Sequence, residues 1–254
     1  MPMKRHDGRK ADELRPIKIT RNFTKHAGGS VVIAFGDTRV LCTAMIEKDL
    51  PPWLRSKNQT SAKPSGWLTA EYGMLPSSTT TRKRRDSGKP DGRSVEIQRL
   101  VGRALRSVID LEQLITPGEK KEGVTLFVDC DVLQADGGTR TASITGAYVA
   151  VADAVRKAIK QGLLTKDAKV LKDKVAAVSV GIVEGTPVLD LDYVEDVAAH
   201  VDMNVAMLSD GSFVEVQGTG EHATFTQKQL DQMLSLAMKG IRQLHADQKR
   251  ALGR

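Results

Sequence analysis

The sequence predicts an α+β fold, in which helices pack on mixed β-sheets. The prediction depends on the order of the apolar patterns, which is strands, helix, strand, helix, strands, helix. The chain has 254 residues, enough to bury a full core, and no internal repeat or sharp boundary divides it. We therefore expect a single domain over residues 1–254, with a polar segment at 1–15 and a tail at 246–254 as candidates for flexible ends.

The first half of the chain predicts a hairpin, a loop, a strand and a helix. Within residues 29–45, two apolar runs flank a Gly-Asp turn, which is typical of a β-hairpin. Residues 50–66 are polar and rich in proline and serine, so they predict a loop. Residues 67–75 are expected to re-enter the body as a strand. A helix is predicted from Ser94, its expected N-cap, because apolar side chains then recur at helical spacing.

The second half continues with strands and helices. Residues 124–132 alternate apolar and polar side chains as a half-buried strand does, and helical spacing then follows up to Gly162. The last helix has a capping-box pattern, with Thr226 as N-cap and Gln229 three residues later. Four further strands are predicted over residues 174–183, 187–192, 201–208 and 212–217.

The composition favours binding to a polyanion. The formal net charge is +7 and the sequence pI is about 9.4. Basic side chains gather within residues 82–93, which lie beside a run of serines and threonines. Contact with an RNA backbone is one interpretation of this segment, and a solvated charged loop is the alternative.

Several other classes of protein are disfavoured. No apolar run approaches the roughly 20 residues that span a bilayer, and we expect no secretory signal at the polar start. The five histidines are scattered without an i,i+4 pair, which disfavours a metal site built from histidines. Cys42 and Cys130 both fall within predicted strands, and two such thiols indicate a reducing cytoplasm rather than a framework of disulfides.

The most informative passage is residues 135–146, ADGGTRTASITG, where a predicted strand turns into a helix. Free backbone N–H groups and the positive end of the helix dipole meet at such a turn, and Arg140 adds a bidentate cation, so the passage suits a phosphate. Neither the dinucleotide fingerprint nor the P-loop pattern fits. An ordinary Gly-Gly turn with a threonine cap and a solvated arginine is the alternative. Arg93 precedes the start of another predicted helix, a second position that favours anions.

An acidic cluster interrupts this otherwise basic chain. Its carboxylates are Asp190, Asp192, Glu195, Asp196 and Asp202. We expect Asp190 and Asp192 to point from one face of a strand, and adjacent antiparallel strands to bring Asp196 and Asp202 together. Paired carboxylates with few other protein ligands are typical of Mg²⁺ sites. Turn aspartates and strand-end charges that hold no metal are the alternative.

Several passages together resemble the ribonuclease PH family of phosphate-dependent 3′-to-5′ exoribonucleases, which trim tRNA precursors. They run in order through almost the whole chain, and the block 129–146 is long enough to be highly specific. Ring subunits of the exosome share the fold, but the unbroken block 134–146 and the chain length resemble ribonuclease PH best. The matching passages are residues 21–27, 35–44, 67–76, 92–100, 129–146, 176–183, 193–196, 202–204 and 214–219.

The resemblance implies a fold like domain 2 of ribosomal protein S5 and a homohexameric ring built as a trimer of dimers. It implies that Asp196 and Asp202 serve catalysis and bind Mg²⁺, with Mn²⁺ as the alternative metal. Arg140 is implied to be catalytic as well. The residues implied to bind inorganic phosphate, the co-substrate, are Arg93, Gly138, Thr139 and Arg140.

The resemblance also implies that the loop after Met-Leu-Pro holds RNA. Arg82 and Arg85 match RNA-binding arginines of the family, whereas Ser77 stands where the family has a further arginine. Lys83 or Arg84 could compensate for that departure. Two loops are longer than usual in the family and have no assigned role, namely residues 55–65 and 116–123.

The implied reaction is phosphorolysis, in which inorganic phosphate attacks the 3′-terminal phosphodiester and releases a nucleoside 5′-diphosphate. The implied substrates are tRNA precursors and other structured RNA 3′ ends, and the reverse reaction adds nucleotides. We expect a cytoplasmic enzyme without a membrane partner. The alternative is a non-catalytic RNA-binding ring subunit of an exosome-like assembly, although such subunits usually lose the phosphate arginines or the aspartates. A phosphate-independent hydrolase is a third option, and it would not need two anion sites.

Overall fold

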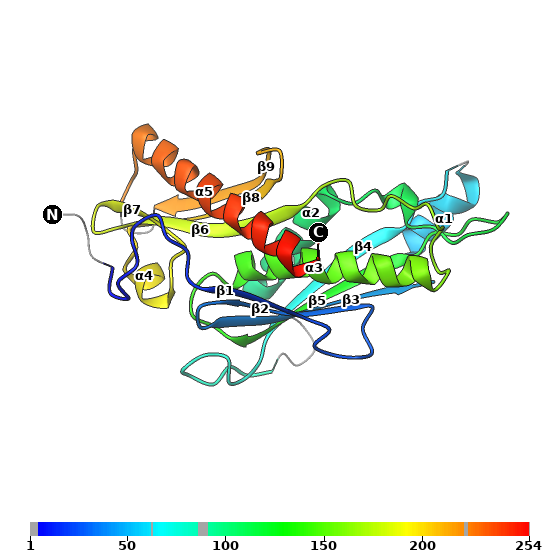
Figure 1. Cartoon of the computed structure of the whole chain (residues 1–254), viewed down its shortest axis with the longest axis horizontal. Coiled ribbons are helices and arrows are strands. Elements are labelled where there is room, and N and C mark those ends of the chain that lie inside the picture. Colours follow the sequence, from blue (N-terminus) through cyan, green and yellow to red (C-terminus); the bar gives the residue numbers. More distant parts are fainter. Residues whose placement is uncertain (1–4, 62, 86–90, 221–222, 254) are drawn as a thin grey trace.

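Two β-sheets enclose a central helix in the computed structural model, which describes residues 5–61, 63–85, 91–220 and 223–253 (Figure 1). The first sheet has five strands in the order β1-β2-β3-β5-β4. β4 and β5 run parallel, and the other neighbouring strands pair antiparallel. The helix α2 (Gly92–Ser107) lies on the connection between β4 and β5. The strands are β1 (Ile17–Arg21), β2 (Gly29–Phe35), β3 (Thr38–Glu47), β4 (Trp67–Met74) and β5 (Thr125–Gln134).

The second sheet is antiparallel, with four strands in the order β7-β6-β8-β9. A short helix, α4 (Tyr193–Ala198), connects β7 to β8. The long C-terminal helix α5 (Gln227–Ala251) packs on β6, β7 and β8, and Figure 1 shows it lying across this sheet. The strands are β6 (Val175–Val183), β7 (Thr186–Leu189), β8 (Val201–Leu208) and β9 (Phe213–Gly220).

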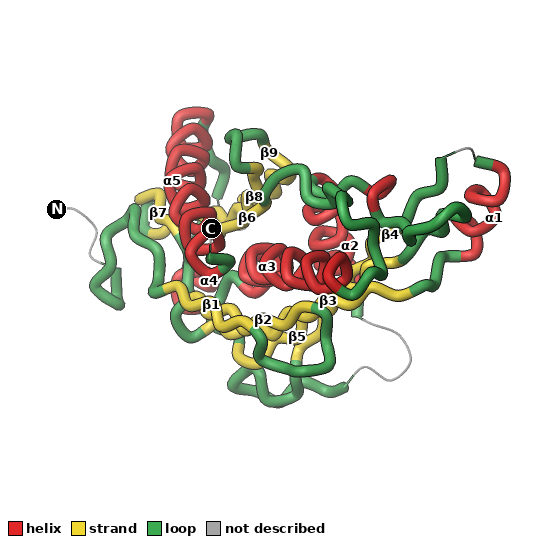
Figure 2. The backbone as a smooth tube through the Cα atoms, turned by 45° about the vertical axis from the view of Figure 1, so that its right-hand side comes forward, coloured by secondary structure: helices red, strands yellow, loops and turns green. Residues whose placement is uncertain are grey.

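The central helix is α3 (Thr139–Lys160), which lies between the two sheets (Figure 2). Most of its residues are buried, because it is apolar or small on nearly every face and packs on strands from both sheets. Small side chains allow a close approach: a Cβ added to Gly146 would lie 2.6 Å from Cγ2 of Ile33 on β2. The core thus fixes α3, and with it the turn that precedes Thr139.

The structure confirms most of the expected elements and corrects four. The segment 50–66 contains α1 (Pro52–Thr60), because proline fits the first turn of a helix and does not exclude one. The N-cap of α2 is Asp91 rather than Ser94, whose backbone N–H donates to the Asp91 carboxylate at 2.6 Å. The edge strand β1 and the helix α4 were not expected. α1 and α4 lie at opposite ends of the longest axis (Figure 1).

The described parts of both terminal segments make contacts with the rest of the chain. In the segment 1–15, of which residues 5–15 are described, the Arg5 side chain is fully buried. The expected tail at 246–254 continues α5 as far as Ala251. Gln248 is buried within it, where its amide donates to the main-chain oxygens of Thr145 and Val175 at 3.0 and 2.9 Å. Among the described helices, none combines the length and the apolar character that crossing a membrane requires.

Candidate active site

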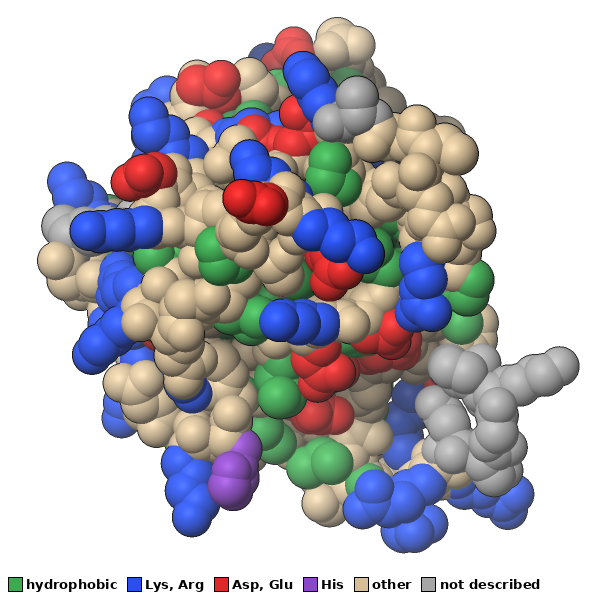
Figure 3. Space-filling view, turned by 90° about the vertical axis from the view of Figure 1, so that its right-hand side faces the viewer, with side chains coloured by type: hydrophobic (Ala, Val, Ile, Leu, Met, Phe, Trp, Pro, Cys, Tyr) green, Lys and Arg blue, Asp and Glu red, His purple; other side chains and the backbone are tan. Residues whose placement is uncertain are grey.

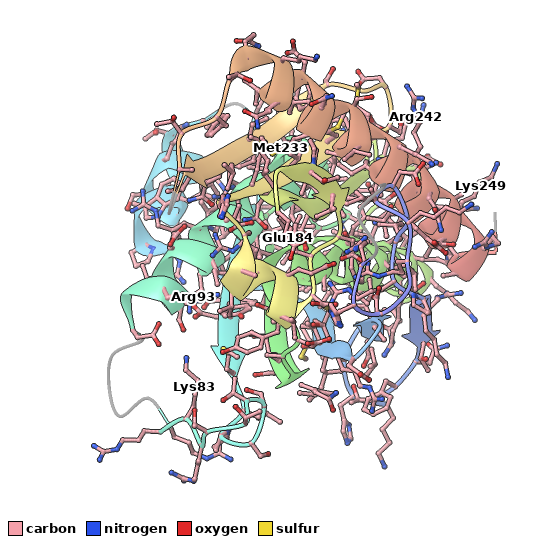
Figure 4. The ribbon with its side chains drawn as sticks, turned by 90° about the vertical axis from the view of Figure 1, so that its left-hand side faces the viewer. Lys83, Arg93, Glu184, Met233, Arg242 and Lys249 are labelled. Atoms are coloured by element: carbon pink, nitrogen blue, oxygen red, sulfur yellow. The ribbon has the colours of Figure 1, made fainter. Side chains whose placement is uncertain are left out.

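A cavity of about 450 Å³ opens where the start of α3, the start of α2, α4 and β8 meet. Figure 4 shows Arg93 at the start of α2 and Lys83 on the loop below it, on the side of the molecule that carries α4. The cavity is lined by Met74, Thr79, Thr80, Thr81, Lys83, Arg93, Ala135, Gly137, Gly138, Thr139, Arg140, Ser179, Tyr193, Asp196, Asp202 and Asn204. All six residues implied to hold phosphate or metal are among them.

The turn before α3 forms one wall of the cavity. Gly137 and Gly138 both have left-handed backbone conformations, with φ of 72° and 66°, which glycine adopts without steric cost. Gly138 is the N-cap, and within the described residues no side chain caps this helix start. The first backbone N–H groups of α3 are therefore available to an anion. The Thr139 hydroxyl lies 2.9 Å from the phenol oxygen of Tyr72, whose pKa is raised by burial, so the phenol stays neutral.

Arg140 extends from this turn toward α2 and β9. Its Nη1 donates to Oε1 of Gln217 at 3.1 Å and lies 3.6 Å from Oε1 of Glu96. Gln217 in turn donates to Glu96 at 2.9 Å, so the three side chains form one network. Arg93 lies in the first turn of α2, where the Asp91 carboxylate caps the helix and has a lowered pKa because of the Ser94 backbone N–H. Two helix starts, each bearing an arginine, therefore line the same cavity.

Two carboxylates line the same cavity as these arginines. Asp196 lies on α4 and Asp202 on β8, and both line the cavity. Asn204, two residues along the same face of β8, donates to Oδ2 of Asp202 at 3.4 Å. We expected two adjacent strands to carry these aspartates, and this is wrong, because Asp196 lies on the helix α4. Both aspartates line one cavity, and their pairing at a metal ion stays a prediction.

The other three acidic residues are not part of the cavity, and the expectation for their geometry is wrong. Asp190 follows the end of β7 with φ of 56°, and Asp192 is the N-cap of α4 in a capping box with Glu195. All three accept hydrogen bonds from the N-terminal segment: Asp190 from Arg15 at 2.7 Å, Asp192 from Arg9 at 3.4 Å, and Glu195 from Arg5 at 2.5 Å. Side chains of residues 5–15 thus neutralise most of the acidic cluster.

One group of three metal-ligand side chains occurs among the described residues. His6, Asp192 and Glu195 offer ligand atoms that lie within 4.8 Å of one another. The Glu195 carboxylate already accepts two hydrogen bonds from the Arg5 guanidinium, at 2.6 and 2.5 Å. Arg9 lies 3.4 Å from both Asp192 and Glu195. The two guanidinium groups repel a cation, so the group is an ion-pair network rather than a metal site.

The basic loop is divided between the cavity and its surroundings. Lys83 lines the cavity and lies 3.4 Å from the Asp91 carboxylate. The other basic side chains described in this loop are exposed and do not line the cavity, namely Arg82, Arg84 and Arg85. Ser77 is exposed as well, and residues 86–90 of the basic segment lie outside the described residues. At the opposite, α1 end, Lys and Arg side chains are interspersed with Asp and Glu (Figure 3).

Sequence reasoning missed several cavity residues. Tyr193, which is 57% exposed, begins α4 and lines the cavity three residues before Asp196. The spacing i, i+3 on a helix could have placed it beside Asp196, had the helix been expected. Asn204 could have been found from its alternation with Asp202 on β8. Ser179 on β6 has no local signal, because only the pairing of β6 with β8 brings it to the cavity.

Comparison with known proteins decides the family. The 3′ exoribonuclease family matches in two parts, domain 1 over residues 13–157 and domain 2 over residues 173–240. A ribonuclease PH from Corynebacterium efficiens is 55% identical over 251 residues, which is 98% of this chain and 96% of the relative. The chain belongs to the 3′ exoribonuclease family. It is a phosphorolytic 3′-to-5′ exoribonuclease, with inorganic phosphate as co-substrate, and the alternative of a non-catalytic ring subunit has less support.

Several solved structures share the fold. The Archaeoglobus fulgidus exosome with RNA bound to the active site gives a TM-score of 0.76 at 24% identity, covering 96% of this chain and 92% of that one. The crystal structure of rice Rrp46 gives a TM-score of 0.75 at 18% identity, covering 98% of this chain and all of the other. At such identities the likeness concerns architecture, and it confirms the expected S5-like α+β fold.

Proposed function

We propose that this exoribonuclease trims the 3′ ends of tRNA precursors and other structured RNAs in the cytoplasm, and that its chemistry takes place in the 450 Å³ cavity. The observation that carries the proposal is the composition of the cavity wall. Two helix starts with arginines lie in the same cavity as two carboxylates, which provides one site for an attacking anion and another for the charge of the scissile phosphate.

In this proposal the attacking phosphate binds at the turn before α3. The first backbone N–H groups of α3, at Thr139 and Arg140, donate to its oxygens, and the Gly138 turn lets the anion approach the main chain closely. The guanidinium groups of Arg93 and Arg140 neutralise its charge and fix its orientation through bidentate hydrogen bonds. Gln217 and Glu96 orient the Arg140 side chain before phosphate arrives.

The residues opposite this turn fit a Mg²⁺ or Mn²⁺ ion. Asp196 and Asp202 supply carboxylate oxygens, with no histidine or cysteine among the cavity residues, and hard oxygen ligands are what these ions prefer. Two protein ligands leave coordination positions for water and for substrate phosphates. When bound there, the ion would neutralise negative charge on the reacting phosphates.

Positioning carries most of the proposed catalysis, as is general for phosphoryl transfer. An oxygen of inorganic phosphate attacks the phosphorus of the last phosphodiester, and the bond from that phosphorus to the 3′ oxygen of the preceding nucleotide breaks. The products are a nucleoside 5′-diphosphate and an RNA shortened by one nucleotide. The departing 3′ oxygen gains the proton that the attacking phosphate loses, which the carboxylate of Asp196 or Asp202 relays. Because a phosphodiester is exchanged for a diphosphate, the reverse addition of nucleotides also proceeds.

Arg140→Ala tests the phosphate site. We expect the variant to remain folded and to bind tRNA, while phosphorolysis falls by about 100-fold or more, the scale that a lost transition-state donor gives. Arg140→Lys should recover little activity, because an ammonium lacks the planar fork of the guanidinium. Release of nucleoside diphosphate from a tRNA with extra 3′ nucleotides, with and without phosphate, is the measurement. Normal release by Arg140→Ala would show that phosphate binds elsewhere.

We include a homohexameric ring, a trimer of dimers, because three arginines of the basic loop lie outside the cavity. Arg82, Arg84 and Arg85 are exposed and can reach the body of a tRNA only beyond the reaction site. Loops from neighbouring subunits of a closed ring could together hold that body, while the 3′ end enters one cavity. Light scattering should therefore give a hexamer.

The basic loop can be tested separately from the chemistry. The triple alanine variant of Arg82, Arg84 and Arg85 should bind tRNA more weakly, and each lost phosphate contact should remove roughly 0.7–0.9 from the slope of log affinity against log salt. Cleavage of a short single-stranded oligonucleotide should change much less, because its 3′ end needs only the cavity. Equal losses on both substrates, or full tRNA trimming by a monomer, would contradict this role.

A further inference from the structure

We propose that Arg15 and Thr38 are positioning residues, which hold the 136–138 turn at a fixed place relative to the segment that leads to Asp196. Neither residue lines the cavity. Both reach the back of the turn, from the N-terminal segment and from the start of β3. The inference rests on the proposed binding of phosphate at this turn, and it names the residues that give the phosphate site its shape.

Arg15 connects the turn before α3 to Asp190, two residues before the N-cap of α4, through one guanidinium group. Its Nη2 and Nε donate to the two oxygens of the Asp190 carboxylate at 2.7 and 3.0 Å, and its own backbone N–H donates to the same carboxylate at 2.8 Å. On the other side, Nη1 donates to the main-chain oxygen of Asp136 at 2.5 Å and Nη2 lies 3.5 Å from that of Gly137. The arginine is 5% exposed and Asp190 is fully buried.

Thr38 holds the turn from a second direction. Its hydroxyl donates to the main-chain oxygen of Gly137 at 2.6 Å and accepts from the backbone N–H of Asp136 at 2.9 Å. The side chain is fully buried at the start of β3. The β2–β3 hairpin, which is part of the first sheet, is thereby tied to the turn on which the phosphate would rest.

The segment after Asp190 needs an external support, because Asp190 has a left-handed backbone with φ of 56°. A residue with a side chain adopts this conformation at a cost, and it persists only where neighbouring groups hold it. The three hydrogen bonds from Arg15 provide that support. Two residues later Asp192 starts α4, which carries Asp196 into the cavity. Arg15 therefore sets the distance between the phosphate turn and the carboxylate wall.

Two conservative variants test the inference. Thr38→Val keeps the volume of the side chain and loses both hydrogen bonds to the turn. Arg15→Lys keeps the charge next to Asp190 and loses the planar guanidinium that binds Asp190 and the turn at the same time. We expect each to raise the KM for phosphate about 10-fold or more while the KM for RNA stays within twofold, because a misplaced turn weakens the grip on phosphate first. Phosphate should also raise the Tm of each variant less than it raises the Tm of the unmodified protein. This second measurement does not depend on enzymatic activity.

Matched controls lie outside the cavity. Thr145 is buried on α3 and makes the same pair of hydrogen bonds, donating to the Ala177 oxygen at 3.2 Å and accepting from its N–H at 3.0 Å. The Arg21 guanidinium donates two hydrogen bonds to the Asp153 carboxylate, at 2.7 and 2.6 Å. Thr145→Val and Arg21→Lys should lower Tm by similar amounts and leave the KM for phosphate unchanged.

The outcomes separate this inference from the proposed function. If Thr38→Val and Arg15→Lys keep the phosphate KM and the phosphate-induced Tm shift of their controls, while Arg140→Ala loses phosphorolysis, the positioning role is wrong and the phosphate site stands. If Arg140→Ala also retains normal phosphorolysis, the phosphate site itself is wrong. Full activity of Arg15→Lys would likewise overturn the role of the fork.

Discussion

Replacing Gly137 with alanine tests whether the phosphate turn must touch the chain that leads to α4. A Cβ at Gly137 would lie 2.6 Å from the carbonyl carbon of Asp192, 2.7 Å from the oxygen of Leu191 and 2.9 Å from the nitrogen of Tyr193. All three are backbone atoms, which cannot swing aside as a flexible side chain can. The turn and the α4 segment must therefore separate, and separation should move the backbone N–H groups of Thr139 and Arg140 away from Asp196.

The expected size of the effect follows from two contributions to the free energy of unfolding. The left-handed backbone of Gly137, with φ of 72°, costs an alanine about 1–2 kcal/mol. Overpacking against the backbone adds about 1–3 kcal/mol. A displacement of the order of 1 Å at a reacting group lowers kcat/KM by about 100-fold.

Gly162 supplies a matched control for this change. Its φ of 71° carries the same backbone cost, but a Cβ there meets no atom within 4 Å. Denaturant unfolding should show a loss of about 1–2 kcal/mol for Gly162→Ala, a larger loss for Gly137→Ala, and reduced phosphorolysis only for the latter. Equal stability and equal kcat/KM in the two variants would refute the reasoning, because the clash at Gly137 would then have no consequence.

Three further predictions concern other parts of the molecule. Asp196→Asn and Asp202→Asn should each abolish phosphorolysis and the reverse polymerisation alike, and activity that survives both changes and a chelator would contradict a metal role. Ser77→Arg should tighten tRNA binding and steepen its salt dependence by roughly 0.7–0.9 in slope, measured by titration at several salt concentrations. Burial lowers the pKa of His245 below its ordinary value of 6.5, so the unfolded chain binds a proton on this side chain more readily than the folded chain does. The free energy of unfolding therefore decreases as the pH falls below 6.5. His245→Gln should therefore narrow the drop in Tm between pH 7.5 and 5.5, whereas an unchanged drop would mean that other groups cause it.

The strongest sequence patterns predicted the fold well because they report burial directly. The alternation over residues 124–132 became β5, with its apolar side chains on the face that α3 covers. The capping box at Thr226 is present with both of its hydrogen bonds. Errors arose where one residue type has two uses. Proline in residues 50–66 was interpreted as a loop signal, but it begins α1. That residues 1–254 form a single domain stays a prediction.

The site was predicted in its parts but not in its architecture. Spacing placed the glycine turn and Arg140 at a strand-to-helix junction, and the structure has that junction. The geometry expected for the acidic passage was wrong, because Asp192 was placed on a strand although Asp192 and Glu195 form a D-x-x-E capping box, which is a helix signal. Nothing local to Arg15 or Thr38 marks them, since their partners lie about 100 residues or more away along the chain. Such residues become visible only when the fold brings distant segments together.

The N-terminal arginines show why an acidic cluster that suggested function is partly structural. Removing Arg5 and Glu195 from water costs several kcal/mol for each charge, and an apolar pair of similar volume could stabilise the fold equally well. An apolar pair, however, could not donate to main-chain oxygens. The Arg5 guanidinium does so at Leu189 and Asp190, at 2.8 and 2.9 Å, while it also binds Glu195 inside α4. The pair therefore fixes where the chain leaves β7 and where α4 begins, which determines where Asp196 meets the cavity.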